Sequence, residues 1–273
     1  MKKIKLIPAL LFAATLLTTE NKAQAPVKNP DVRLSKVVFK GNDFTSETTY
    51  FYDTHFKINK IIYKQDGRLH YTINNITFNN LGLLETYTTT YNLKIAPQKT
   101  TISYNDDNQV IKIEKIKTIP TDKPVIISSQ NYKWSPQQLM VTSAGNTTVY
   151  TFDADNNITE ISFPTTSGAD AFHFNKFDES TNPLTLTGGF VFDKPLSKRN
   201  ATVQQLGSER YTYNVSYTYQ KLLVSKHVPG AAKIPTQYRN GLPLKSTTTW
   251  YDPEAKRKLV TENYTYSYIN VTH

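Results

Sequence analysis

Oxygen-bearing side chains gather at two points where they could bind a cation. One group is Asp153, Asp155, Asn156 and Asn157, and residues 105–108 form the other. Hard cations such as Ca²⁺ favour clustered oxygens, but both groups lack the central glycine and distal glutamate of an EF-hand loop. Asp and Asn also suit tight turns, because they tolerate positive φ and hydrogen-bond their own backbone. We therefore interpret both groups as turns and predict no metal site and no other cofactor.

The residues typical of catalysis do not fall into a known pattern. No two of the five histidines have the spacing of a metal site, and HExxH and GxSxG motifs are both absent. The histidines are His55, His70, His173, His227 and His273. Paired carboxylates for glycoside hydrolysis can meet from any separation in sequence, but nothing singles out a pair. We name no catalytic residue and keep a glycan-active enzyme as a remote alternative.

Alternating tyrosines are the side chains best suited to binding a ligand. In two stretches they occupy every second position, so each set lies on one face of a strand. Facing solvent, they would form a ladder for stacking on sugars or gripping a protein partner. Facing inward, they would belong to the core, which is the interpretation that we favour. The candidate binding residues are Tyr211, Tyr213, Tyr217, Tyr219, Tyr264, Tyr266 and Tyr268.

A repeated unit must position these side chains. In its clearest copy, residues 146–163, an aromatic strand leads into an Asp- and Asn-rich turn, and β-branched residues follow. Such flanks favour a pleated, half-buried surface. The aromatic residues that open the units recur roughly every 18–30 residues, a spacing typical of repeat architectures. They are Tyr52, Phe78, Tyr104, Trp134, Phe152 and Phe177.

Later segments continue the pattern. Residues 211–219 alternate strictly, and Asn240-Gly241 is the dipeptide most typical of a hairpin turn. We expect another turn, rich in basic residues, between Pro253 and Leu259, and a longer loop over residues 191–209. The sequence therefore predicts an all-β fold, an antiparallel meander of repeated β-hairpins that forms a curled or self-packed sheet. Residues 26–273 would form this single domain.

The repeat resembles that of a known family. Four aromatic–Asp dipeptides resemble the YD dipeptides of YD-repeat (Rhs-like) proteins: Tyr52-Asp53, Phe152-Asp153, Phe177-Asp178 and Tyr251-Asp252. Residues 177–184 also resemble an element of small exported bacterial proteins of uncharacterised function that carry YD-like repeats. The resemblance implies a β-repeat fold and a location in the cell envelope. It does not indicate an activity.

The first 25 residues have the pattern of a bacterial secretory signal peptide. Lys2, Lys3 and Lys5 precede an apolar run, and Ala23-Gln24-Ala25 matches a cleavage site. The apolar run has about a dozen residues, fewer than the roughly 20 that a transmembrane helix needs. We therefore expect an exported protein, periplasmic, cell-surface or secreted, that begins near Pro26.

Charge and cysteine content narrow the functional classes. The formal net charge is +10, but four lysines against one glutamate in residues 1–25 leave +7 for the rest. These charges are dispersed among acids, so we predict no nucleic-acid partner. The chain has no cysteine and no disulfide, and about 250 residues can supply enough buried surface without one.

These observations favour a non-enzymatic binding or structural module of the cell envelope, with a glycan or cell-surface protein as partner. Open edge strands would make dimerisation through edge pairing plausible. The alternative is an outer-membrane β-barrel, because aromatic strands of about ten residues fit one. Against it, many alternating positions hold Thr, Asn and Lys, and the sequence ends on His273 rather than on an aromatic residue. We expect no membrane association beyond export.

Overall fold

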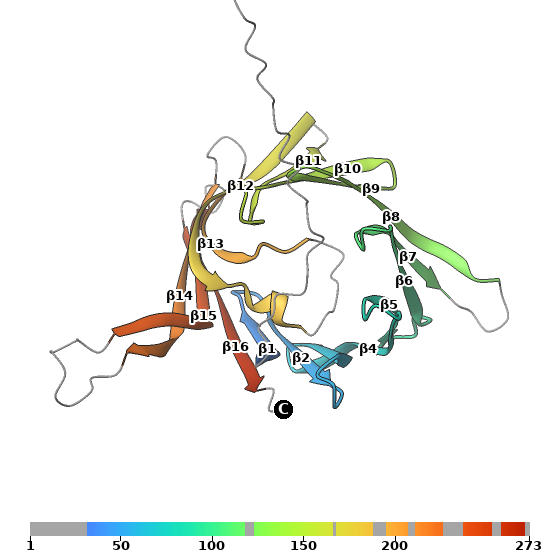
Figure 1. The fold of residues 1–273 in the computed structure, drawn as a ribbon, viewed down its shortest axis with the longest axis horizontal. Helices are drawn as coiled ribbons and strands as arrows, with labels where there is room; N and C mark the ends of the chain where they lie inside the picture. Colours follow the sequence, from blue (N-terminus) through green and yellow to red (C-terminus); the bar gives the residue numbers. More distant parts are fainter. Residues whose placement is uncertain are drawn as a thin grey trace, which may run out of the picture.

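The computed structural model describes residues 32–117, 123–165, 168–187, 195–206, 211–225, 237–252 and 258–270, which form one antiparallel meander (Figure 1). The predicted signal peptide lies outside these residues. In order, the described elements are β1 (Val32–Lys40), β2 (Thr45–Tyr52), β3 (Ile58–Gln65), β4 (Arg68–Phe78), β5 (Leu84–Tyr91), β6 (Gln98–Tyr104), β7 (Val110–Lys117), β8 (Val125–Ser135), β9 (Gln138–Ser143), β10 (Asn146–Phe152), β11 (Ile158–Thr165), β12 (Gly168–Thr181), the 3₁₀ helix η1 (Pro183–Leu186), β13 (Arg199–Leu206), β14 (Tyr211–Ser225), β15 (Gln237–Asp252) and β16 (Lys258–Asn270).

The meander closes into a barrel, because β1 pairs with both β2 and β16. In the closing pair Val32 lies opposite Asn270 and Lys40 lies opposite Asn263. The prediction of an antiparallel hairpin meander is confirmed, but the expectation of a curled sheet with open edges is wrong. Closure gives every described strand two neighbours, which removes the exposed edge on which the proposal of dimerisation was based.

Four of the predicted turns share one backbone geometry. Asp153 Oδ1 accepts the N–H groups of Asp155 at 2.9 Å and Asn157 at 2.8 Å, and Asn156 has a φ of 64°. The equivalent acceptors are Asp53, Asn79 and Asn105, and the equivalent positive-φ residues are Phe56, Gly82 and Asn108. The repeated Asp or Asn therefore has a structural purpose: it supplies the side-chain acceptor that closes the turn.

The hairpin turn predicted at Asn240-Gly241 was wrong. Both residues lie inside β15, where Asn240 pairs with Lys221 of β14. Long-range pairing has overridden local turn preference there. The turn expected after Trp250 includes residues 253–257, which lie outside the described residues. The loop expected over residues 191–209 contains a strand, β13.

Three of the repeated aromatic side chains form hydrogen bonds to the backbone of an earlier strand. The Tyr52 hydroxyl donates to the Leu34 carbonyl at 2.5 Å, and the Tyr104 hydroxyl to that of Leu84 at 2.6 Å. Trp134 Nε1 donates to the Val110 carbonyl at 2.9 Å. Leu84 and Val110 each begin the strand that follows a shared-geometry turn. In these three copies the aromatic residue is therefore both apolar filling and a hydrogen-bond donor, whereas Phe78, Phe152 and Phe177 have no donor group.

We expect Tyr104→Phe to lower the free energy of unfolding by about 1 kcal/mol, because it removes one partly buried hydrogen bond and little apolar surface. Burial raises the pKa of Tyr104 to about 12, so its hydroxyl is a donor at neutral pH. Urea unfolding followed by circular dichroism would measure the change. Tyr63→Phe is the control, since Tyr63 packs against Tyr71 at a ring separation of 4.8 Å and its hydroxyl bonds to no described residue. Equal losses in both variants would contradict the role of the Tyr104 hydrogen bond.

Candidate binding site in the barrel interior

The inner face of the barrel wall is aliphatic and aromatic. The 3₁₀ helix η1 lies inside the ring of strands and contacts β1 (Figure 1). Its Leu186, 3 % exposed, packs into a cluster with alternate residues of the strands, which identifies their inward side. Members from successive strands are Tyr50, Ile61, Ile73, Tyr87, Ile102, Ile113, Tyr132, Val141 and Tyr150. From β2 to β10, the side chains at alternate positions of each strand therefore face inward and form the core.

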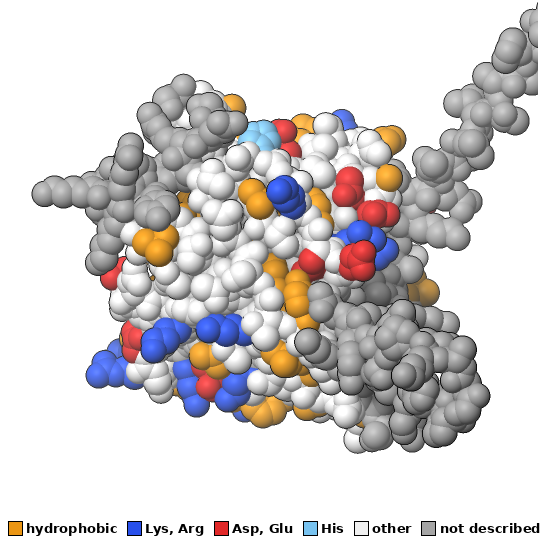
Figure 2. Space-filling view, turned by 90° about the vertical axis from the view of Figure 1, so that its left-hand side faces the viewer, with side chains coloured by type: hydrophobic (Ala, Val, Ile, Leu, Met, Phe, Trp, Pro, Cys, Tyr) orange, Lys and Arg blue, Asp and Glu red, His pale blue; other side chains and the backbone are white. Residues whose placement is uncertain are grey.

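The outer face is polar. The Lys36 ammonium lies 3.1 Å from the Glu47 carboxylate, on the side of the wall opposite to Tyr50, and its hydrogen bond lowers the pKa of Glu47. Lys112 and Glu114 form a second outer pair at 2.8 Å. The face in Figure 2 shows mainly uncharged polar side chains and backbone, with some hydrophobic side chains between them and with Lys and Arg gathered toward the lower left. Exposed apolar side chains are scattered over several strands, as at Phe51 and Met140, and three are consecutive at the start of β8, Val125 to Ile127.

The candidate tyrosines face the interior of the barrel. Tyr213, Tyr217, Tyr264 and Tyr266 line one cavity between β12 and β16. On the same inner face Tyr219 donates to Asp178, and Tyr268 donates to the Pro243 carbonyl at 2.6 Å. The side chain of Tyr211 lies outside the described residues. The structure therefore brings these side chains together across strands, although not as a ladder on the outer surface.

The cavity between β12 and β16 has a volume of about 410 Å³. Besides the four tyrosines, its lining includes Phe172, Trp250 and Glu262. The Tyr213 and Trp250 rings lie 5.2 Å apart and are tilted by 49°. Sequence reasoning missed these three lining residues, although Glu262 precedes Tyr264 by two positions and strand alternation places both on one face. This volume falls within the range of about 300–1,000 Å³ typical of small-molecule sites.

Hydrogen bonds hold the cavity's hydroxyl groups in place. The Tyr217 hydroxyl donates to the Ala201 carbonyl at 3.1 Å, and the hydroxyls of Ser246 and Tyr266 lie 3.0 Å apart. Burial raises the pKa of Tyr217, Tyr266 and Tyr264, the last to about 12. Burial also raises the pKa of the Glu262 carboxyl above its usual range. The tyrosines carry no charge at neutral pH. Glu262 is therefore the one acidic group among the described residues that line the cavity, and none of these residues is basic.

A second cavity of about 320 Å³ lies on the inner face of β2–β7. Its lining is also rich in tyrosine but contains a cation, Lys115, in place of a carboxylate. The lining residues are Thr48, Tyr50, Ile61, Tyr71, Ile73, Tyr87, Thr89, Tyr91, Gln98 and Lys115. Each of the two cavities therefore combines aromatic walls with one acidic or basic side chain, Glu262 or Lys115.

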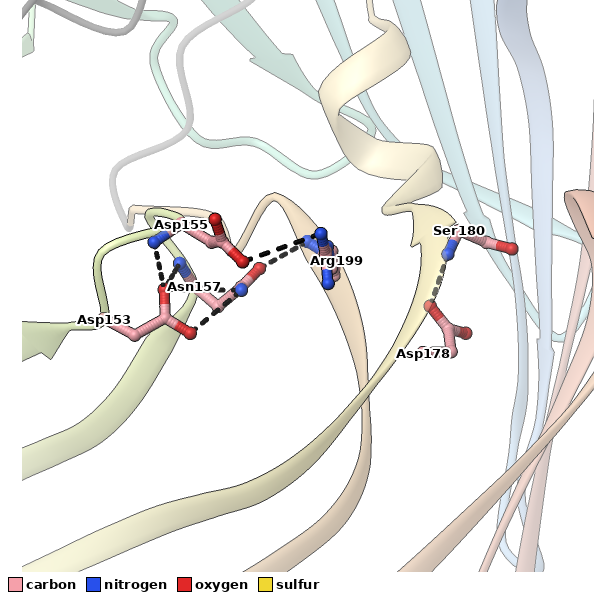
Figure 3. A network of polar contacts seen from close by, with 6 residues as sticks. All are labelled: Asp153, Asp155, Asn157, Asp178, Ser180 and Arg199. Atoms are coloured by element: carbon pink, nitrogen blue, oxygen red, sulfur yellow. Dashed lines mark hydrogen bonds and ion pairs between the residues drawn. The ribbon is translucent and has the colours of Figure 1, made fainter.

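The acidic turn at Asp153 is part of a network of hydrogen bonds and an ion pair. Asn157 donates to the Asp153 carboxylate, and its own Oδ1 accepts the Arg199 N–H at 2.9 Å (Figure 3). Arg199 also lies 3.6 Å from Asp155, so both carboxylates already face donors. Among the described residues, no group of three His, Asp or Glu side chains is placed to hold a metal ion. His173 lies beside Glu160 at 3.6 Å, while His227 and His273 fall outside the described residues.

No helical segment in the described ranges has the length and hydropathy of a transmembrane helix. Comparison with known proteins identifies no family: no family model matches the sequence, and no curated protein matches it significantly. Among solved structures, the chain is similar to a porin-like protein from Bacteroides uniformis, with 14 % identity over 88 % of this chain and 96 % of that one. The TM-score is 0.39, so the match carries no argument about function.

Proposed function

We propose that this chain is an exported cell-envelope β-barrel that remains in water and binds a small ligand in its interior. The observation that carries the proposal is the polarity of the wall, aromatic inside and polar outside. Ion pairs such as Lys36–Glu47 would be costly to place in lipid, whereas an interior with two cavities offers aromatic rings and hydroxyl groups to a small molecule.

An outer-membrane barrel is the second candidate, and the closed barrel favours it over a curled module. One antiparallel meander whose first and last described strands pair is the architecture that such barrels use. Lipid-spanning barrels, however, face lipid with an apolar band and fill their interior with polar groups. Here the outer positions of β14–β16 hold Asn214, Ser216, Thr218, Thr247, Thr249, Asn263 and Thr265, as their alternation with the inward tyrosines requires.

Two other earlier hypotheses gain no support. Neither cavity is lined by two carboxylates, the arrangement that most glycoside hydrolysis requires, so we do not propose hydrolysis. The tyrosines face the interior, which does not favour a platform for a cell-surface protein. The kinship with YD-repeat proteins stays a prediction.

Binding of a neutral apolar dye tests the interior site. We expect N-phenylnaphthylamine to become fluorescent with the purified protein in detergent-free buffer, and Val215→Phe to weaken its binding at least fivefold. Val215 lines the cavity and is buried, so the larger ring fills the space that the dye would occupy. Ser216→Phe on the outer face is the control, with circular dichroism to verify that both variants fold. Absence of dye binding, or equal loss in both variants, would contradict an interior site.

A further inference from the structure

The cavity between β12 and β16 has a charge imbalance. Glu262 of β16 is half-buried among aromatic rings, and no described residue forms a hydrogen bond or ion pair with it. The other side chains lining the cavity are uncharged at neutral pH. An acidic group that is removed from water without a partner destabilises its charged form, which is why its pKa is raised. A bound cation would supply the missing partner.

The rings around Glu262 suit the same kind of ligand. Trp250, Tyr213 and Tyr264 line the cavity with it, and Phe172 completes the aromatic wall. Aromatic faces carry negative electrostatic potential and attract organic cations, most strongly when water is excluded. A metal ion would instead require several oxygen ligands, which the cavity does not offer. Aromatic rings with a single carboxylate therefore favour a bulky, weakly hydrated ammonium.

We infer that this cavity binds an organic ammonium ion, whose charge lies against Glu262 and whose carbon groups contact the rings of Trp250, Tyr213 and Tyr264. This inference rests on the proposed interior binding function and specifies its ligand class. The cavity volume of about 410 Å³ accommodates a small quaternary or primary ammonium compound rather than a polymer. Lys115 in the second cavity makes that site unsuitable for the same ligand.

Calorimetric titration with choline and its neutral isostere 3,3-dimethylbutan-1-ol tests the charge requirement. We expect choline to bind at least tenfold more tightly than the alcohol, and Glu262→Gln to weaken choline binding at least tenfold. Trp250 fluorescence should change on binding, since the other tryptophan, Trp134, does not line this cavity. Affinity should fall as pH drops through the raised pKa of Glu262, because protonation removes the charge that faces the ligand. The titratable groups lining the cavity beside it are Tyr213, Tyr217, Tyr264 and Tyr266, which stay neutral over that range.

The matched control is Glu114→Gln, which removes a carboxylate from the outer face, where Glu114 pairs with Lys112. It should leave choline binding unchanged. Equal affinity for choline and the alcohol, unchanged binding by Glu262→Gln, no detectable choline binding, or binding of chito-oligosaccharides instead would each overturn the inference. N-phenylnaphthylamine binding that survives in Glu262→Gln would show that the interior site is intact even when the ammonium inference fails.

Discussion

Replacing Ile102 with aspartate is expected to prevent stable folding of the barrel. Ile102 is 4 % exposed, lies opposite Ile113 and belongs to the inner cluster. Losing a buried isoleucine costs about 2–5 kcal/mol, and an unpaired buried charge adds several more. Since domains are stable by about 5–15 kcal/mol, the folded fraction should collapse. Circular dichroism of the purified variant, or its yield of soluble protein on expression, would measure the folded fraction, and we expect both signals to be lost.

The neighbouring residue provides the control. Ser103 lies on the outer face opposite Lys112, so an aspartate there meets water and a cation. We expect Ser103→Asp to change the free energy of unfolding by less than about 1 kcal/mol. A barrel embedded in lipid with a wet interior predicts the opposite order, in which the outward aspartate is harmful and the inward one tolerated. That order would overturn the assignment of the two faces.

Asn157→Ala is expected to destabilise the protein by about 2–4 kcal/mol. The side chain is 1 % exposed, donates to Asp153 and accepts the Arg199 N–H, which links the turn after β10 to the start of β13. Removing it leaves the half-buried Arg199 N–H without its acceptor, at about 1–3 kcal/mol, and deletes one hydrogen bond to the Asp153 carboxylate, which keeps its two backbone donors, at about 1 kcal/mol more. The midpoint of urea unfolding should fall accordingly.

Gln109 occupies the equivalent position of an earlier turn, where its N–H donates to Asn105. Among the described residues, its side chain accepts from Asn105 alone, at 3.1 Å. Gln109→Ala should therefore cost less than half as much as Asn157→Ala. Similar losses would mean that the Arg199 link contributes little and that turn chemistry alone explains Asn157.

The local units were predictable from the sequence because their chemistry is local. Tyr52, Phe78, Tyr104 and Phe152 precede turns whose Asp or Asn acceptors act within five residues, and the sequence pattern shows this directly. The Asn240-Gly241 prediction was wrong because β14 and β15 pair beyond it. Closure was missed because the register between β1 and β16 depends on residues more than 200 positions apart, for which no local signal exists.

The candidate site was predicted in part. Alternation identified Tyr213, Tyr217, Tyr264 and Tyr266 as one kind of residue, and they line one cavity. The same alternation applied to Glu262 would have added the carboxylate, but an isolated acid among polar residues gave no reason to single it out. Trp250 and Phe172 come from other strands and reach the cavity only through the pairing order.

Partition between water and membrane is the most direct test of the central claim, that the wall is polar outside and aromatic inside. The purified protein would be analysed by size exclusion with light scattering in detergent-free buffer, then mixed with phospholipid vesicles and floated on a density gradient. We predict a monodisperse species of defined mass that stays at the bottom of the gradient with its β-sheet signal intact. Aggregation without detergent, together with flotation and a heat-modifiable band on electrophoresis, would contradict the account and assign the barrel to the outer membrane.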